Sequence, residues 1–405
     1  MKDKRLAIIF FTVFLDLVGF GIIIPLNPYL AKEYGATPLQ VGLLMSVYSL
    51  MQFIFAPFWG QLSDRYGRRP IILISLLGAA IAHTGFAFSN FFLGLVLARG
   101  FAGLFGGNIS TAMAYIADIT ESKDRSKGMG MIGAAFGLGF VLGPFIGGML
   151  AQLGKSLGDS PPLGENFSAL IAGLLCFLNF LSALRFLPES RLPGQVSRQL
   201  PSRWKRISST LTTPVLGGAI GIVFLSTFAM ANIEASLFLF VREHFLWDLT
   251  QASLGFAYIG VILVFTQGYL IRKWMPKFGE RKLLLLGLFL SAVGFALIAV
   301  SHELGLLTVA VTVLGLGNGL VNPALNGIVS LLSGKDVQGN NLGVSQSLSS
   351  VARILGPAMG GYLYQAYGSA LPFATAAGIA GLGLLLAFQL REKFPEGGKA
   401  GVAHG

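Results

Sequence analysis

The stretch that decides the fold reads QVGLLMSVYSLMQFIFAPFWGQL (residues 40–62), SDRYGRR (63–69) and PIILISLLGAAIAHTGFAFS (70–89). A helix needs about 20 predominantly apolar residues to cross the hydrocarbon core of a bilayer, and both outer runs are that long. The connector between them is short and carries one acid and three arginines. This alternation predicts two membrane-spanning helices that are joined by a charged loop outside the membrane.

The same alternation continues along all 405 residues, of which 54% are hydrophobic and only 12% charged. Soluble proteins carry about 25% charged residues, so a water-soluble chain is excluded. The sequence therefore predicts an all-α membrane protein with twelve transmembrane helices. The expected spans are 6–30, 40–62, 70–89, 91–116, 128–153 and 167–187 in the first half, and 214–241, 250–271, 282–301, 304–332, 341–367 and 370–390 in the second.

An internal repeat divides the chain into two six-helix bundles. The segment LGPFIGG at 142–148 recurs as LGPAMGG at 355–361. Paired repeats of this kind are typical of secondary transporters, in which one repeat rocks against the other around a central site. We expect an N-terminal bundle at 1–187, a linker at 188–213, a C-terminal bundle at 214–390 and a tail at 391–405. The linker is too short for a soluble domain, which needs about 50 residues.

The net charge of +11 has an explanation in topology and needs no nucleic-acid partner. Of the 29 Lys and Arg residues, Lys32, Lys155 and Arg242 fall in connectors on one side of the expected bundle, and Arg99 and Arg353 fall within helices. All the others fall in segments on the opposite side. Because basic residues are retained in the cytoplasm, we expect a multi-pass protein of the cell (inner) membrane with both termini cytoplasmic.

Four ionisable residues stand deep in the expected spans: Asp16, Arg99, Glu234 and Arg353. Placing each of these side chains in the bilayer costs at least about 2.5 kcal/mol, so each is expected to have a functional or structural role. Asp16 either carries a proton or cation, or serves as a structural partner of Arg99. Glu234 either receives an organic cation or a proton, or is structural. Arg353 either pairs with Glu234 or holds an anionic substrate, and the sequence leaves all of these alternatives open.

Neutral polar, aromatic and Met residues at helical spacing are candidates for lining a central cavity, although bonding between helices is the commoner fate of the polar ones. We find no metal-ligand cluster, nucleotide-binding loop or nucleophile elbow, so we expect neither catalytic residues, nor a metal, nor an enzyme. The cavity-lining candidates are Asn27, Gln52, Asn108, Phe136, Phe140, Phe228, Met230, Phe238, Asn318, Asn322 and Gln346.

The connector GQLSDRYGRRP at 60–70 resembles the signature loop of the major facilitator superfamily. The resemblance implies a conformational latch between the two halves, in which Asp64 meets the start of the eleventh helix. The second copy, at 268–282, departs from the pattern because Arg272 stands where Asp64 would align, so one full latch is expected. The latch residues are Gly60, Asp64, Arg65, Gly67, Arg68 and Arg69.

Further motifs resemble those of the twelve-helix drug/proton antiporters, the group that contains the tetracycline exporters. They are LDLVGFGIIIPLNP at 15–28, ARGFAGLFGG at 98–107, AYIADITESKDR at 114–125 and GLGFVLGPFIGG at 137–148. Tetracycline exporters also carry acids within the third and ninth helices, which this chain lacks, so tetracycline is not the expected substrate. The residues matching the antiporter helix motif are Gly139, Gly143, Pro144, Gly147 and Gly148.

The expected function is secondary active transport: proton-coupled efflux of a small amphipathic or cationic organic compound or drug. The expected partners are that substrate, protons and the lipid bilayer, with a functional monomer, no cofactor and the proton gradient as driving force. One alternative is proton-coupled uptake of a sugar or organic anion, with Arg99 or Arg353 as its anchor. Another is a receptor or lipid-handling role without proton coupling.

Overall fold

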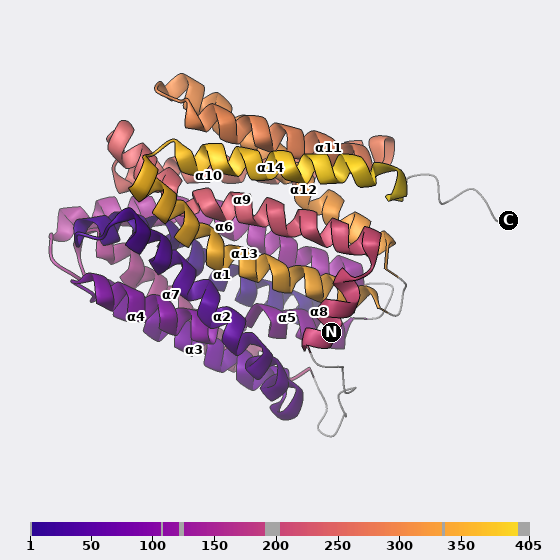
Figure 1. Cartoon of the computed structure of the whole chain (residues 1–405). Coiled ribbons are helices and arrows are strands. Elements are labelled where there is room, and N and C mark those ends of the chain that lie inside the picture. Colours follow the sequence, from indigo (N-terminus) through magenta and orange to yellow (C-terminus); the bar gives the residue numbers. More distant parts are fainter. Residues whose placement is uncertain (1, 107, 121–124, 191–202, 334–336, 396–405) are drawn as a thin grey trace. The chain divides into compact units, whose positions relative to one another are not determined.

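The computed structural model describes residues 2–106, 108–120, 125–190, 203–333 and 337–395 (Figure 1). All regular secondary structure in these ranges is helical. The first half contains α1 (Lys2–Glu33), α2 (Pro38–Tyr66), α3 (Arg68–Ala87), α4 (Phe92–Phe105), α5 (Asn108–Ile119), α6 (Arg125–Leu157), η1 (Gly164–Asn166) and α7 (Phe167–Phe186). The second contains α8 (Arg203–Leu211), α9 (Pro214–His244), α10 (Leu249–Phe265), η2 (Thr266–Leu270), α11 (Ile271–Ala299), α12 (Leu304–Leu331), α13 (Gln338–Tyr367), α14 (Leu371–Leu390) and η3 (Arg391–Lys393).

Within the described residues, ten helical segments are long and apolar enough to cross a membrane. One of them, Leu249–Ala299, has 51 residues, more than twice the length that a single crossing requires. Counting this segment as two helices and adding α13, which is long enough but less apolar, gives the twelve helices that the sequence predicts. Large apolar side chains such as Leu97 (63% exposed) and Leu385 (61%) face outward, as expected for contact with lipid. The fold class predicted from the sequence is confirmed.

Two helix boundaries differ from the expectation. α4 ends at Phe105, inside the fourth predicted span, and the next residue is Gly106, a poor helix former, whose ψ of +16° is no longer helical. The connector expected at 272–281 is mostly helical: α10 continues through the π-helical turn η2 into α11, and two helices meet inside α11 across a kink. The chain bends there at Gly279, whose φ of +73° lies in the left-handed region that favours glycine.

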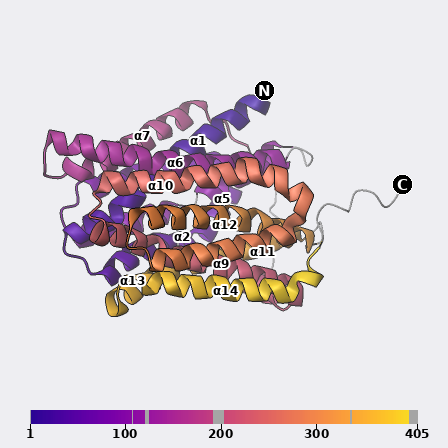
Figure 2. The same ribbon diagram turned by 90° about the horizontal axis from the view of Figure 1, so that it is seen from above.

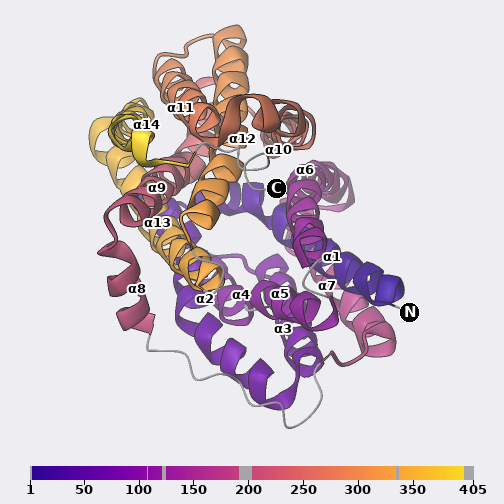
Figure 3. The ribbon, with the colours of Figure 1, turned by 90° about the vertical axis from the view of Figure 1, so that its right-hand side faces the viewer.

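The chain divides into two compact units, one of residues Met1–Arg198 with Val241–Gly260 and the other of Gln199–Phe240 with Val261–Gly405. In the first unit, α1 packs against α6 and α7, while α2, α3, α4 and α5 lie together (Figure 3). In the second unit, α11 packs between α12 and α14 (Figure 2). Each unit has its own apolar core, which includes Leu17, Leu76 and Tyr115 in the first and Leu284, Leu325 and Val329 in the second.

The repeated glycine motif makes the same kind of contact in each unit. In the first unit, a Cβ on Gly143 of α6 would lie 2.6 Å from the Cα of Gly21 on α1. In the second, a Cβ on Gly356 of α13 would lie 2.7 Å from the Cβ of Ala231 on α9. Both distances are shorter than van der Waals contact, so only glycine lets these backbones approach so closely.

Candidate functional site

Arg99 is buried in the first unit between two aromatic rings. Its side chain projects from α4 and is 4% exposed. The guanidinium carbon lies 4.5 Å from the centroid of the Tyr48 ring on α2 and 5.5 Å from that of Phe20 on α1. Ring faces attract a cation, and the planar guanidinium suits stacking against them. Three helices therefore hold the charge of Arg99 in one place.

A row of aromatic rings extends from this arginine. The Phe20 ring lies 5.0 Å from that of Tyr48 and 6.2 Å from that of Phe140, and Phe140 in turn lies 6.4 Å from Phe136 (centroid distances). The structure thus brings the predicted residues Phe136 and Phe140 of α6 toward Arg99. Sequence reasoning missed Tyr48. The available signal was its position one turn before Gln52 on α2, which places both on one helix face.

The other predicted residues of the first unit have varied surroundings. Asp16 is half-buried, lies one turn before Phe20 and is within electrostatic reach of the buried Cys176 of α7. Gln52 donates from Nε2 to the carbonyl oxygen of Gly106 at 2.8 Å, and so bridges α2 to the end of α4. Asn27 is fully buried and donates from Nδ2 to the Ile23 carbonyl oxygen of its own helix at 3.0 Å. The side chain of Asn108 lies outside the described residues.

In the second unit, Glu234 and Arg353 lie on helices that touch, α9 and α13. Both side chains are half-buried. Arg353 donates from Nη2 to Ser350 Oγ of its own helix at 3.3 Å. Between the two helices, Thr227 Oγ1 of α9 donates to Ser349 Oγ of α13 at 3.5 Å. The remaining candidates differ in exposure: Phe238 is buried, Phe228 is half-buried and stacks on Phe224, and Asn322 and Gln346 are exposed.

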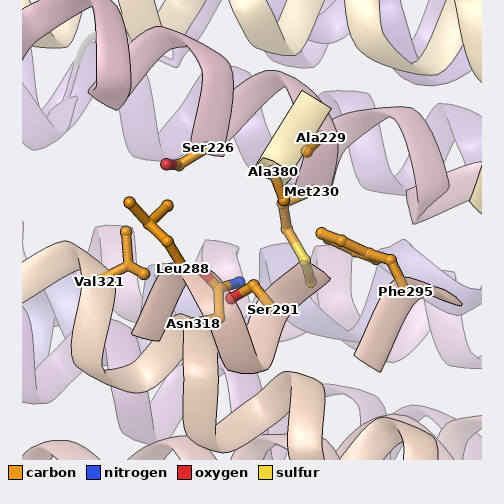
Figure 4. Close-up of a pocket in the computed structure, with 9 residues that line it drawn as sticks. All are labelled: Ser226, Ala229, Met230, Leu288, Ser291, Phe295, Asn318, Val321 and Ala380. Atoms are coloured by element: carbon orange, nitrogen blue, oxygen red, sulfur yellow. The ribbon is translucent and has the colours of Figure 1, made fainter. Parts of the chain in front are cut away.

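A pocket inside the second unit includes two predicted residues, Met230 and Asn318 (Figure 4). Most of its lining is apolar, and three polar side chains interrupt it. Asn318 of α12 and Ser291 of α11 point toward each other, whereas the Met230 thioether and the Phe295 ring supply apolar surface (Figure 4). The full lining of the pocket is Ser226, Ala229, Met230, Leu288, Ser291, Phe295, Asn318, Val321 and Ala380.

The residues predicted for the latch lie around a charge cluster at the junction of α2 and α3, and their role as a latch stays a prediction. Arg68 is buried and pairs with two acids: Nη1 lies 2.8 Å from Asp64 Oδ1, and Nε lies 3.1 Å from Asp118 Oδ2. It also donates to Ser63 Oγ at 2.7 Å. Sequence reasoning missed Asp118, although it lies within a quoted motif. Of the other latch residues, Gly60 and Gly67 are half-buried, Arg65 is exposed over the ring of Tyr66, and Arg69 donates to a carbonyl of α7.

The antiporter helix motif lies on two faces of α6. Gly139, Gly143 and Gly147 lie against α1, where Cβ atoms would meet Leu17, Gly21 and Ile22 at 2.6–3.0 Å. Pro144 is buried beside Gly21. Gly148 faces α10 instead, where a Cβ would lie 2.7 Å from that of Ser253, and its carbonyl oxygen accepts a hydrogen bond from Thr250 at 3.1 Å.

The end of the first unit that carries the α1–α2 connector has a polar network. Arg242 donates to the Tyr29 carbonyl oxygen at 2.9 Å and stacks over its ring, and the Tyr29 hydroxyl donates to the Trp247 carbonyl oxygen at 2.7 Å. Lys32 pairs with Glu243 at 3.4 Å. In the connector, burial raises the pKa of Tyr34, which keeps its hydroxyl protonated as the donor to the Ser89 carbonyl oxygen.

Comparison with known proteins identifies the family. The model of the Major Facilitator Superfamily matches residues 9–278 and 219–404. The class E tetracycline resistance protein of Escherichia coli is 34% identical over 360 residues, which cover 87% of this chain and 86% of that protein. Multidrug resistance protein 1 of Bacillus subtilis (strain 168) is 30% identical over 368 residues, which cover 90% of each chain. The crystal structure of the human organic anion transporter MFSD10 (TETRAN) superposes with a TM-score of 0.73 at 25% identity, covering 95% of this chain and 99% of that one. The chain is therefore a transporter of the Major Facilitator Superfamily.

Proposed function

We propose that this protein is a proton-coupled antiporter that exports a small amphipathic or cationic organic compound through the cell membrane, with both termini in the cytoplasm. The observation that carries the proposal is the placement of Arg99 between Phe20 and Tyr48, with Asp16 one turn from Phe20 on the same face of α1. A half-buried acid, a fixed cation and an aromatic surface thus occupy adjoining positions in one unit.

In this proposal Asp16 carries the proton. Hydrocarbon disfavours an isolated carboxylate, whereas a nearby guanidinium favours it. The balance between these effects lets Asp16 take up a proton when the site faces outward and release it when the site faces the cytoplasm. Arg99 cannot discard its own proton, so it acts as a constant charge that makes release easier.

The proposed substrate class follows from the side chains near these charges. Phe, Tyr and Met residues form adaptable apolar surfaces, and aromatic rings attract organic cations. Glu234, on the same helix as Met230 of the pocket, supplies a second acid for a cation or a proton. The tetracycline and multidrug resistance proteins, which are about a third identical to this chain, support drug efflux.

Transport of an organic anion is the second candidate. It is favoured by the buried Arg99 and the half-buried Arg353, which place one cation within the span of each unit. It is also supported by the human protein MFSD10, which is described as an organic anion transporter. An anion would pair directly with one of these guanidinium groups.

Reconstitution into liposomes that contain a pH-sensitive dye separates these functions. A pH gradient is imposed, and lipophilic cations, neutral drugs, sugars and organic acids are added in turn. Antiport predicts proton release on addition of cations or drugs, with at least a tenfold loss in Asp16→Asn and Glu234→Gln. Asp159→Asn is the matched control, because Asp159 is exposed in the connector between α6 and η1.

The outcomes are distinct. A response to organic acids or sugars alone would replace the proposal with the second candidate or with uptake. Substrate movement without proton movement would indicate uncoupled transport or lipid handling. Proton coupling that survives in Asp16→Asn would remove Asp16 from the mechanism.

A further inference from the structure

Glu189 stands just beyond the end of α7, in the segment that the sequence assigns to the linker. Its Oε1 accepts a hydrogen bond from the backbone N–H of Arg68 at 2.9 Å, and its Oε2 accepts one from that of Arg69 at 3.1 Å. Oε1 also accepts from the N–H of Ser190 at 2.9 Å. One carboxylate thus binds the first two residues of α3.

These bonds supply a cap that α3 otherwise lacks. The first N–H groups of a helix have no partner within the helix and are normally satisfied by the side chain of the preceding residue. Here that residue is Gly67, and α3 has no cap from a local side chain. The charged carboxylate of Glu189 fills this role from 120 residues away and also suits the positive end of the helix dipole.

Gly67 provides the space for this contact. Its φ of +101° lies in the left-handed region, and a Cβ would lie 2.8 Å from the carboxyl carbon of Glu189. The glycine of the signature loop therefore serves both the turn and the entry of the carboxylate.

Neighbouring bonds attach the same segment to the latch. Arg69 donates from Nη2 to the Leu184 carbonyl oxygen at 2.7 Å, and Tyr115 donates to that of Pro188 at 2.8 Å. Ser190 Oγ lies 3.2 Å from Asp118 Oδ2, the oxygen that also pairs with Arg68. The end of α7 and the signature loop are thus joined through side chains of α3, α5 and the segment after α7.

We propose that Glu189 is a positioning residue for the latch: it fixes the start of α3 so that Arg68 holds Asp64 in place, and thereby sets the rate of alternation. This inference rests on the proposed transport function. Because Glu189 acts through the loop and not on the substrate, its loss should lower the maximal rate and leave the apparent substrate affinity unchanged.

Hydrogen–deuterium exchange of the full-length protein tests the contact without any substrate. In Glu189→Ala, exchange of the Arg68 and Arg69 amides should accelerate by about tenfold or more, since bonds to a charged acceptor are among the stronger ones. Glu189→Gln retains one oxygen acceptor without the charge, so its exchange rates at Arg68 and Arg69 should lie between those of the wild type and of Glu189→Ala. Glu392→Ala is the matched control, because Glu392 is an exposed acid at the corresponding end of the second repeat. Unchanged exchange in Glu189→Ala would overturn the proposal.

Transport in liposomes then separates positioning from a merely structural role. Glu189→Ala should lower the maximal rate at least fivefold at unchanged KM, and Glu189→Gln should restore part of it. Faster exchange with a normal maximal rate would overturn the proposal, as would a rise in KM that matches the loss of rate. A wild-type protein that moves none of the compounds would contradict the proposed function instead, and the exchange data would still decide whether Glu189 holds the loop.

Discussion

The contact between α1 and α6 provides a sharp test, because a single methyl group should disturb it. In Gly143→Ala, the new Cβ would lie 2.6 Å from the Cα of Gly21 and 2.9 Å from the carbonyl oxygen of Val18. Ordinary van der Waals contact begins at 3.4 Å, so α1 and α6 would have to separate by at least 0.8 Å at Gly21. Both obstructing atoms belong to backbone, which cannot rotate away as a flexible side chain can.

This separation has an energetic and a functional consequence. Overpacking of a tight contact costs about 1–3 kcal/mol, which should appear as a lower melting temperature of the purified protein. Because α1 also carries Asp16 and Phe20, the displacement should reach the candidate proton site. We therefore expect the proton-coupled transport rate in liposomes to fall at least tenfold.

Gly133→Ala is the matched control, because Gly133 lies in the same helix and its Cβ would meet no atom within 4 Å. Replacing this helical glycine should be neutral or stabilise by up to about 1 kcal/mol. Equal melting temperatures and equal transport rates for the two variants would refute the argument that glycine at 143 is required for close packing.

The remaining predictions concern two polar contacts of the first unit. Arg99→Lys should lower the transport rate about tenfold with little change in melting temperature. The reason is that an ammonium loses the planar stacking on Tyr48 and can release its proton when buried. A wild-type transport rate at every external pH between roughly 6 and 8, the range in which proton coupling is assayed, would contradict this role. Tyr29→Phe leaves the Trp247 carbonyl oxygen without its 2.7 Å donor, and should cost about 1–3 kcal/mol of stability. Thermal unfolding measures the second effect, and an unchanged melting temperature would show that water replaces the hydroxyl.

The sequence by itself determined the class of fold and the family. Apolar runs of about 20 residues can satisfy their backbone groups in a bilayer only as helices, so length and composition suffice to count the spans. The loop at 60–70 and the repeated LGP motif then point to the superfamily. Both conclusions depend on local patterns, which are present in the chain before it folds.

Helix breaks and continuations were harder to predict from the sequence. The end of α4 carries a local signal in Gly106, but a helix in a membrane tolerates glycine, so the signal was ambiguous. The charged segment 272–282 of α11 has the composition of a loop, yet it is helical on both sides of the kink at Gly279. Composition indicates where a chain leaves the membrane and does not determine whether it stays helical there.

Only the tertiary structure decided which side chains meet. Tyr48 stacks on Arg99, Asp118 pairs with Arg68, and Glu189 caps α3, although each pair is separated by some 50 to 120 residues in the chain. Helical periodicity shows which residues share a face of one helix, but not which other helix that face contacts. In a membrane this choice depends on close backbone approach at small residues and on polar bonds between helices, and both arise only when the helices pack.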